Sequence, residues 1–404
     1  MKILIHSNAP WEATGYGKQT RLLIPRLLGD GHEVVVSCVS GLNGGEIYWP
    51  VDGTSDDGHY EFEHRKTIRI LPRGQYDFGP DTLPAYIEDE RPDLVLLIMD
   101  CRMLGSIAEH LSTVQLQQDG PYIAAWVPSD TNPLSRPELA FLTVSGVRPI
   151  AMSRFAEGLL NDEDLSPAYI PHMVDTSVFC PRGEVLAARE EDRESLGIPA
   201  DAFVVGMVAA NNDAIRKGFP EQFEAFRRFR KSNQRAHLVV HTVAKSGRGH
   251  DLESLALDLD LGGAVSFTPA LPQVVGRFDD AWMARLYRSF DVLSACSYAE
   301  GFGVPILETQ ACGTPVVVTD FGAMAEVGWY GFRVASQPFW NPVHKAWWGR
   351  PDVGEIVRGL NFFAKGGSSA GHRENYLDFA RGFDADLIFQ TCWRPFLSEV
   401  EASR

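Results

Sequence analysis

The sequence lacks three features that would place the protein in a specialised class. It has no apolar run near the roughly 18 residues that a membrane-spanning helix needs. Its six cysteines lie far apart without a C-x-x-C pair, which excludes an obvious zinc or disulfide framework and favours a reducing cytoplasm. Lys and Arg number 37 against 53 Asp and Glu, and this net charge of −16 argues against broad nucleic-acid binding.

The chain has the composition of a globular protein and the alternating strand and helix patterns of the α/β class. Its 404 residues, at roughly 150 per domain, predict two large domains. Strand-like runs alternate with amphipathic stretches, and a run that is apolar throughout, such as Leu94–Met99, is typical of a parallel sheet covered on both faces. We therefore predict an α/β fold: two Rossmann-like, doubly wound parallel-sheet domains facing a cleft.

A charged stretch after Cys180 marks the expected boundary. We predict an N-terminal Rossmann-like domain over residues 1–182, a linker over 183–200 and a C-terminal Rossmann-like domain over 201–375, followed by a helical tail over 376–404. In open α/β sheets, ligands bind beyond the carboxyl ends of the strands, so functional residues are expected on the strand-to-helix loops.

The segment 297–317 carries the most specific pattern in the sequence. It follows a buried strand, forms a glycine-bearing loop and enters a helix with Pro305 in its first turn. Glu300 lies in the loop and Glu308 on the helix, so both carboxylates can face one pocket. A single glutamate at either position is more often a surface or helix-cap residue. The complete pattern over residues 297–317 is what specifically indicates a binding site.

The same loop also offers backbone donors. Amide groups around Phe302, Gly303 and Val304 stand at the start of the predicted helix, where an anion such as phosphate is stabilised. A carboxylate one turn further on can accept two hydrogen bonds from a ribose diol, and one on the loop can contact sugar hydroxyls.

This segment closely resembles the E-x7-E motif of glycosyltransferase family 4. Further segments are similar to the family's pattern, well over the second half of the chain and loosely over the first: Ser153–Phe155, Ile170–Pro181, Val205–Val208, Arg216–Gly218 and Asp320–Val327. His172 stands where the family usually has Asn, and Arg216 adjoins Lys217 where the family separates the two cations.

The resemblance implies a GT-B fold and a retaining transfer of a sugar from a nucleotide-sugar donor, most often a UDP- or GDP-sugar, to an acceptor hydroxyl. It implies no required cofactor and a C-terminal helix that returns to the first domain. It also implies that Glu308 binds the ribose and Glu300 the transferred sugar. The expected route is front-face, through an oxocarbenium-like transition state, with the departing phosphate oxygen taking the acceptor proton.

Arg216 and Lys217 fit the leaving group on chemical grounds. A departing nucleoside diphosphate gains negative charge, and fixed cations beside it stabilise the transition state more than the ground state. Cations at the start of a helix oppose its dipole, which disfavours a purely solvated role. We assign both residues to catalysis and the preceding Asn212 to donor binding, and leave open which cation is the main diphosphate ligand.

The first half contributes three further candidates. Gly15 and Gly17 follow the first strand and allow backbone amides to approach a phosphate or sugar, although a plain tight turn explains them equally. Asp130 follows another strand and is either a catalytic-site residue that contacts the sugar or acceptor, or the cap of the helix near Pro137.

No metal site is expected. Asp-x-Asp triplets at 162–164, 258–260 and 384–386 fall on helices or adjoining loops and not at strand ends, where a metal-dependent transferase would place one. The Arg216–Lys217 pair makes a metal unnecessary for holding the diphosphate.

The sequence leaves open the class of acceptor and several alternative functions. An aromatic-rich stretch over 329–348 is interpreted as packing between domains in preference to stacking on sugars. The long segment 41–66 is interpreted as either a functional loop or a disordered insertion. The acceptor hydroxyl belongs to a glycan, a lipid, a small molecule or a modified nucleic-acid base, the last needing a patch such as the basic run over 227–235. Another GT-B enzyme, such as an epimerase or phosphorylase, and a noncatalytic nucleotide-sugar-binding subunit remain alternatives.

Overall fold

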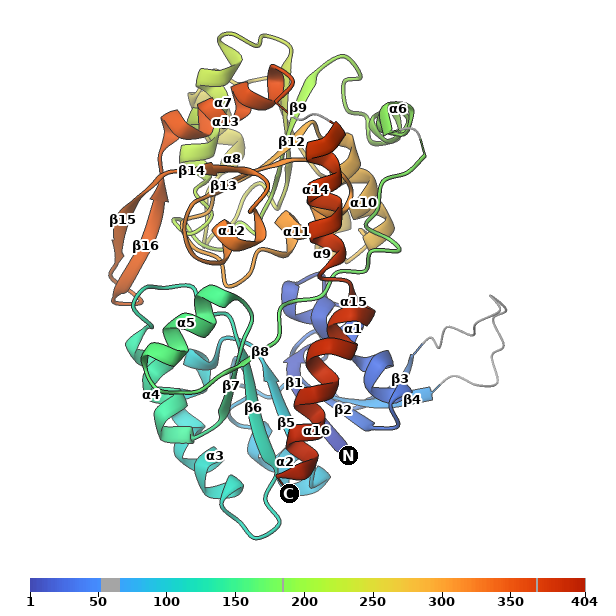
Figure 1. Cartoon of the computed structure of the whole chain (residues 1–404), viewed down its shortest axis with the longest axis vertical. Coiled ribbons are helices and arrows are strands. Elements are labelled where there is room, and N and C mark those ends of the chain that lie inside the picture. Colours follow the sequence, from blue (N-terminus) through green and yellow to red (C-terminus); the bar gives the residue numbers. More distant parts are fainter. Residues whose placement is uncertain (52–65, 184, 368–369, 404) are drawn as a thin grey trace. The chain divides into compact units, whose positions relative to one another are not determined.

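The computed structural model describes residues 1–51, 66–183, 185–367 and 370–403 (Figure 1). The chain forms two compact units that do not follow one another simply in sequence. Unit 1 comprises Met1–Ser129, Pro133–Met173 and Ala385–Arg404, and unit 2 comprises Asp130–Asn132 and Val174–Asp384. The main chain therefore leaves unit 1 after Met173 and returns to it at Ala385.

Unit 1 is built on one sheet whose strand order is β3-β4-β2-β1-β5-β6-β7-β8. Every neighbouring pair is parallel except β3 and β4, which form an antiparallel edge. The strands are β1 (Lys2–Asn8), β2 (Glu33–Ser40), β3 (Ile47–Val51), β4 (Lys66–Leu71), β5 (Leu94–Ile98), β6 (Tyr122–Val127), β7 (Arg148–Ala151) and β8 (Ala168–Tyr169).

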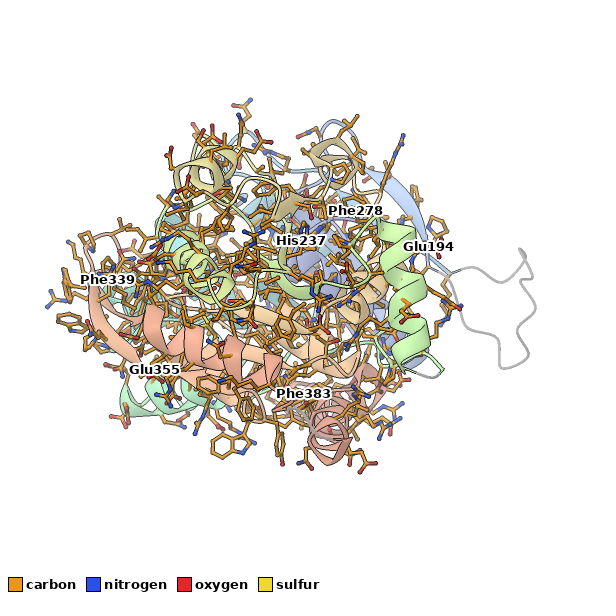
Figure 2. All side chains as sticks on the ribbon, turned by 90° about the horizontal axis from the view of Figure 1, so that it is seen from above. Glu194, His237, Phe278, Phe339, Glu355 and Phe383 are labelled. Atoms are coloured by element: carbon orange, nitrogen blue, oxygen red, sulfur yellow. The ribbon has the colours of Figure 1, made fainter. Side chains whose placement is uncertain are left out.

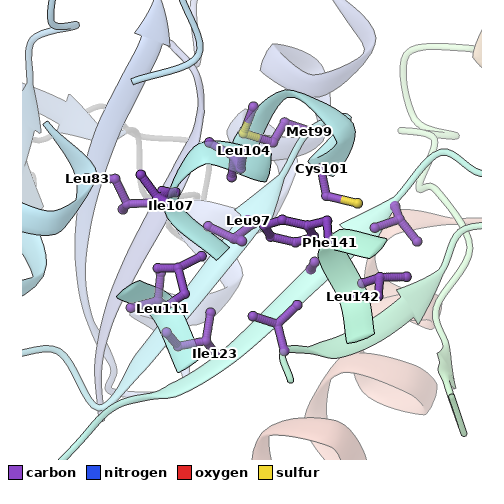
Figure 3. Close-up of a cluster of buried hydrophobic side chains, with 14 of the residues drawn as sticks. Leu83, Leu97, Met99, Cys101, Leu104, Ile107, Leu111, Ile123, Phe141 and Leu142 are labelled. Atoms are coloured by element: carbon purple, nitrogen blue, oxygen red, sulfur yellow. The ribbon is translucent and has the colours of Figure 1, made fainter. Parts of the chain in front are cut away.

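Helices accompany this sheet because the central strands are apolar on both sides. Leu97 from β5 and Ile123 from β6 pack against Leu104, Leu111 and Phe141 on the covering helices (Figure 3). The helices are α1 (Gly15–Gly29), α2 (Leu83–Glu90), the 3₁₀-helix η2 (Cys101–Ile107), α3 (Ala108–Gln115), α4 (Arg136–Ser145), α5 (Arg154–Asp162), α15 (Ala385–Ile388), the π-helix η3 (Phe389–Trp393) and α16 (Arg394–Ala402).

The last residues of unit 1 are packed into its interior. Trp393 is fully buried, and its ring meets Trp126 of β6 at a centroid distance of 5.0 Å. His172 also contacts the ring of Trp126, at a centroid distance of 4.7 Å, and burial lowers the pKa of His172 to about 3. A neutral histidine presents an aromatic ring here, which suits its contact with the indole.

Unit 2 has a parallel sheet in the order β11-β10-β9-β12-β13-β14. The strands are β9 (Phe203–Val208), β10 (Ala236–His241), β11 (Val265–Phe267), β12 (Val292–Ala295), β13 (Val316–Thr319) and β14 (Phe332–Val334). The strand order reverses between β9 and β12, and such a switch point is where doubly wound sheets bind ligands. The predicted α/β class with two doubly wound sheets is confirmed.

Helices of unit 2 pack on this sheet through long apolar faces. Phe223, Phe226 and Phe229 of α7 meet Ile356 and Leu360 of α13 in one core. The helices are α6 (Val185–Leu196), α7 (Phe219–Arg230), α8 (Leu252–Asp258), α9 (Ala270–Val274), α10 (Asp280–Ser289), α11 (Val304–Ala311), α12 (Gly322–Val327), α13 (Val353–Ala364) and α14 (Ala370–Arg381).

The segment 183–200, which we expected to be an interdomain linker, belongs to unit 2 and carries α6. Two of its cations reach the residue that precedes β12: Arg189 and Arg193 each pair with Asp291 at 2.7 Å. Arg288 of α10 pairs in turn with the buried Asp192 at 2.8 Å. These buried pairs fix α6 against α10, and a charged sequence was therefore no sign of an exposed connection.

A two-stranded hairpin projects from unit 2 and was not predicted (Figure 1). It consists of β15 (Ser336–Asn341) and β16 (Ala346–Pro351), paired antiparallel. It takes up much of the aromatic-rich stretch that we had interpreted as domain packing. In the other aromatic segment, 41–66, residues 47–51 form β3, whereas residues 52–65, including Tyr60 and Phe62, lie outside the described residues.

Candidate functional site

The loops after β9 and β12 meet at the switch point of the unit 2 sheet. Arg216 and Lys217 lie on the first loop, directly before α7, and Glu300 lies on the second, directly before α11. Gly218 has φ +57°, and a Cβ there would stand 2.7 Å from the Cys296 carbonyl oxygen. Glycine is thus required both by the left-handed backbone and by the close approach of the two loops.

The three charged side chains form one cluster. Arg216 Nη1 lies 3.2 Å from Glu300 Oε2, and Lys217 Nζ donates to Glu300 Oε1. The Ser297 hydroxyl also donates to Oε1, at 2.7 Å. The side chains of Lys217 and Glu300 are only 11% and 16% exposed, whereas Arg216 is 32% exposed and faces solvent more fully. The predicted cations and the predicted loop carboxylate are therefore brought together.

Burial and charge oppose each other in this cluster. Burial on its own would raise the pKa of Glu300, but the charges of Lys217 and Arg216, with hydrogen bonds from Lys217 and Ser297, lower the pKa to about 2. The pKa of Lys217 is lowered by burial and by the neighbouring Arg216, against the pull of Glu300. Two cations therefore share one carboxylate, an arrangement suited to receiving a further anion.

A buried glutamine joins the two loops and was missed by the sequence reasoning. Gln222 of α7 donates from Nε2 to the Lys217 carbonyl at 2.8 Å. Its Oε1 accepts from the Ser294 hydroxyl at 2.7 Å and from the Cys296 amide at 3.2 Å. Gln222 lies one helical turn after Lys217, but nothing in the sequence indicates that its amide reaches β12. Ser297, whose hydroxyl donates to Glu300, lies only three residues before it and was therefore easier to find from the sequence than Gln222.

The helix after Glu300 begins as the sequence predicted. Gly303 has φ +104° and precedes α11, whose second residue is Pro305. Phe302 is buried, and Val304 is half-buried at the first helical position. The amides at this helix start are thus placed beside Glu300 on the same loop, where a helix N-terminus favours an anion.

Glu308 is buried on α11 and has a partner that the sequence did not reveal. The Tyr287 hydroxyl donates to Glu308 Oε2 at 2.7 Å. Burial and the carboxylate together raise the pKa of Tyr287 well above its ordinary value, so the phenol remains a donor. Tyr287 is one of the buried residues of α10, and no sequence motif had singled it out.

The other predicted donor-binding residues are described within their own units. Gly15 and Gly17 begin α1 in unit 1; Gly15 is exposed, and the Gly17 amide donates to Thr14 Oγ1 at 3.0 Å. Asn212 is exposed after β9, whereas its neighbour Asn211 is buried and donates to the His250 carbonyl at 2.8 Å.

Asp130 is buried and is counted with unit 2. Its charge acts to raise the pKa of Lys217, although burial and Arg216 outweigh it. The competing interpretation of Asp130 as a helix cap is wrong, because the residue that precedes α4 is Ser135. The Asp-x-Asp triplets stand at the end of α5, at the end of α8 and immediately before and within α15.

Comparisons with known proteins found relatives in sequence and in structure. Residues 188–329 match the family model for glycosyl transferases group 1. D-inositol 3-phosphate glycosyltransferase of Thermomonospora curvata is 33% identical over 162 residues, which cover 37% of this chain and 35% of that protein. The corresponding protein of Stackebrandtia nassauensis is 38% identical over 162 residues, covering 38% and 33%. The chain therefore spans about a third of the length of these curated relatives.

Similarity to solved structures extends over nearly the whole chain. Sucrose-phosphate synthase from Thermosynechococcus elongatus superposes with a TM-score of 0.72 at 16% identity, covering 99% of both chains. Anabaena HepE in complex with UDP and glucose gives 0.67 at 17% identity, covering 98% of this chain and 100% of that one. The chain has the GT-B fold.

The GT-B fold is thereby established from both the sheet topology and the superpositions, as the sequence resemblance had implied. Within the described ranges, no helix has both the length and the apolar character that crossing a membrane requires.

Proposed function

We propose that the protein is a retaining, metal-independent glycosyltransferase of family 4 that moves a sugar from a nucleotide-sugar donor to an acceptor hydroxyl. The observation that carries this proposal is the meeting of Arg216, Lys217 and Glu300 at the switch point of the unit 2 sheet. The named glycosyltransferase relatives and the neighbours solved with UDP or a UDP-sugar support it.

The leaving diphosphate is the group that needs both cations. Arg216 can bind two phosphate oxygens through its guanidinium fork, and Lys217 adds a buried point charge. The amides at the start of α11 supply further donors. As the bond from the anomeric carbon to the phosphate oxygen breaks, charge accumulates on that oxygen, and donors fixed in advance stabilise it without reorganising.

Glu300 has a distinct role once donor is bound. A diphosphate supplies the negative charge that Glu300 supplies to Arg216 and Lys217 in the present arrangement. The carboxylate then accepts hydrogen bonds from hydroxyls of the transferred sugar. Asp130 and the α1 glycines, Gly15 and Gly17, remain proposed contacts of the sugar or acceptor.

The transfer itself needs no dedicated base in this proposal. The acceptor oxygen attacks the anomeric carbon on the face from which the diphosphate leaves, and the acceptor proton passes to the departing phosphate oxygen. The new bond and the lost bond share one face, which retains the anomeric configuration. Glu308, oriented by Tyr287, accepts hydrogen bonds from the ribose diol.

The donor is expected to be a UDP- or GDP-sugar, and the expected compartment is the cytoplasm. All six cysteines are free thiols, and four of them are buried, which fits a reducing environment.

A donor panel tests the proposal. UDP-, GDP- and ADP-sugars are incubated with the parent protein, and hydrolysis and transfer are followed by mass spectrometry. We expect turnover with one nucleotide class, retention of the anomeric configuration by NMR, and unchanged rates in EDTA. Glu300→Ala and Lys217→Ala are expected to lower kcat by about 10²–10³.

Matched controls come from an exposed ion pair of the same unit, Lys245 with Glu253. Lys245→Ala and Glu253→Ala are expected to behave as the parent. Equal turnover in the parent, Glu300→Ala and Lys217→Ala would overturn the assignment of the site. Binding of donor without any turnover would point instead to a noncatalytic nucleotide-sugar-binding subunit.

A further inference from the structure

The β15–β16 hairpin presents two different faces. Its register opposes Phe339 to Trp348 and Trp340 to Trp347. Because side chains alternate along strands, the first pair faces inward and the second outward. Trp348 is 1% exposed, whereas Trp340 and Trp347 are 47% and 43% exposed. The two outer indoles contact each other at a centroid distance of 5.2 Å and an angle of 68°.

The inner face fastens the hairpin to the loop that carries Glu300. Phe339, labelled in Figure 2, meets the ring of Tyr298 edge-on at 5.1 Å. The Gly349 amide donates to the Tyr298 carbonyl at 3.1 Å. Tyr298 stands two residues before Glu300, so the hairpin is attached directly to the candidate site.

A polar contact reinforces this attachment. The Tyr298 hydroxyl donates to Glu221 Oε1 at 2.7 Å, and Arg350 of β16 reaches the same oxygen at 3.3 Å. Glu221 belongs to the first turn of α7, the helix that follows Lys217. The hairpin is therefore held by the Tyr298 loop and by the first turn of α7.

The outer face has no ionisable side chain among its six described positions. These positions are Ser336, Pro338, Trp340, Trp347, Gly349 and Pro351. Gly349 and Pro351 are buried at the base of the hairpin, so the exposed part of this face is formed by Pro338 and the two indoles. A phosphate-bearing partner would need a cation here, and the overall charge of −16 adds repulsion. Two neighbouring exposed indoles instead offer apolar ring faces together with N–H donors.

We infer that the Trp340–Trp347 face binds a neutral sugar ring of the acceptor. The C–H-rich face of a pyranose packs against an indole, while its hydroxyls accept from the indole N–H groups or remain in water. This inference rests on the proposed function and deepens it: among the open acceptor classes, it selects a glycan. An exposed apolar pair on a hairpin whose opposite face packs on the loop of the candidate site is the kind of surface that marks binding.

The test measures saccharide binding and transfer separately. Neutral trisaccharides of glucose, galactose and mannose are titrated against the full chain by saturation-transfer NMR. The same saccharides serve as acceptors with the donor that the panel selects. We expect Trp340→Ala and Trp347→Ala each to raise the acceptor KM about 3- to 10-fold, and the double variant more. Trp340→Phe and Trp347→Phe, which keep a stacking ring, are expected to recover most of the loss.

A third indole provides the matched control. Trp329 is 57% exposed in the same unit but lies outside the hairpin, with Arg333 over its ring at 4.7 Å. Trp329→Ala is expected to leave saccharide binding and KM unchanged. Melting temperatures with and without nucleoside diphosphate verify that each variant keeps a folded unit 2.

The outcomes separate this inference from the proposed function. The inference would be overturned if the parent and the folded double alanine variant bound saccharides equally. It would also be overturned if the double variant lost self-association of the chain and kept its saccharide binding. Absence of turnover with every nucleotide sugar would overturn the proposed function. A saccharide-binding NMR signal that is present in the parent and absent in Trp340→Ala would still support the hairpin site.

Discussion

The Tyr287 hydroxyl donates a 2.7 Å hydrogen bond to Glu308 Oε2 inside unit 2, and both side chains are buried. The phenol thus fixes the orientation of the carboxylate that we assign to the ribose. A buried carboxylate that loses such a donor pays its full desolvation penalty, and its position becomes less defined.

Tyr287→Phe tests this relationship. Loss of the hydroxyl should lower the free energy of unfolding by about 1–3 kcal/mol and weaken donor binding several-fold. The measurement is the Kd of the preferred nucleoside diphosphate and of its 2′,3′-dideoxy analogue, by calorimetry. Because the analogue has no diol, parent and variant should bind it alike. An equal loss of affinity for both ligands would show that Tyr287 acts through general packing.

Gly218→Ala tests the close approach of the two site loops. The residue has φ +57°, and the added Cβ would stand 2.7 Å from the Cys296 carbonyl oxygen. We expect a loss of about 1–3 kcal/mol in unfolding free energy and a marked fall in kcat/KM, since the Lys217 and Glu300 loops must separate. Gly247→Ala, where a Cβ meets nothing within 4 Å, is the control. Parent-like activity in Gly218→Ala would contradict the required geometry.

Much of this architecture was readable in advance because it depends on local pattern. The sequence pattern predicts helices over 219–230 and 280–289 and strands over 122–127 and 292–295, and α7, α10, β6 and β12 have these bounds. Arg216, Lys217 and Glu300 were assigned from motif and loop position, and the parallel β9–β12 pairing brings those loops together.

What escaped prediction depends on partners distant in sequence. Gln222 and Tyr287 look like ordinary helix residues until β12 and α11 are placed beside them. The hairpin β15–β16 was read as packing aromatics, because one face of it is indeed buried and the alternation was not followed over its six residues. The buried pairs of α6 have the composition of a solvated segment and differ only in their contacts.

Acid should weaken the contribution of Glu300. Its pKa of about 2 lies below the ordinary value of 4.5, so the stabilisation is present above pH 4.5 and is lost as the pH falls toward 2. Glu300→Gln should therefore be less stable than the parent at pH 7, by on the order of 3 kcal/mol. The gap should close between pH 4.5 and 2, as measured by urea unfolding. A gap that stays constant over this range would argue against the ion-pair cluster.

The burial of His172 predicts a second contribution to folding stability, in unit 1, that is lost in acid. His172 has a pKa of about 3 in the folded chain against 6.5 ordinarily, so the unfolded chain binds more protons between these values. Stability is therefore full above pH 6.5 and decreases as the pH falls. His172→Asn should reduce the slope of unfolding free energy against pH, between 6.5 and 4, by about 1.4 kcal/mol per pH unit. An unchanged slope would show that another group dominates.

The charges of α6 predict a large stability effect remote from the site. Arg193 is buried, and its removal leaves Asp291 with one cation fewer. Arg193→Ala should cost about 3–5 kcal/mol. Arg182→Ala, at an exposed residue whose partner Glu191 is 3.7 Å away, should cost less than about 1 kcal/mol. Equal melting temperatures for the two variants would refute the structural role of α6.

The path of the chain has a consequence for protein engineering. Apart from Asp130–Asn132, unit 2 runs from Val174 to Asp384, and the residues from Ala385 onward complete the packing around Trp126 in unit 1. A chimera that borrows the second unit from a homologue therefore needs two splice junctions, near 173/174 and 384/385. Replacing everything downstream of the first junction would exchange part of the recipient's own core.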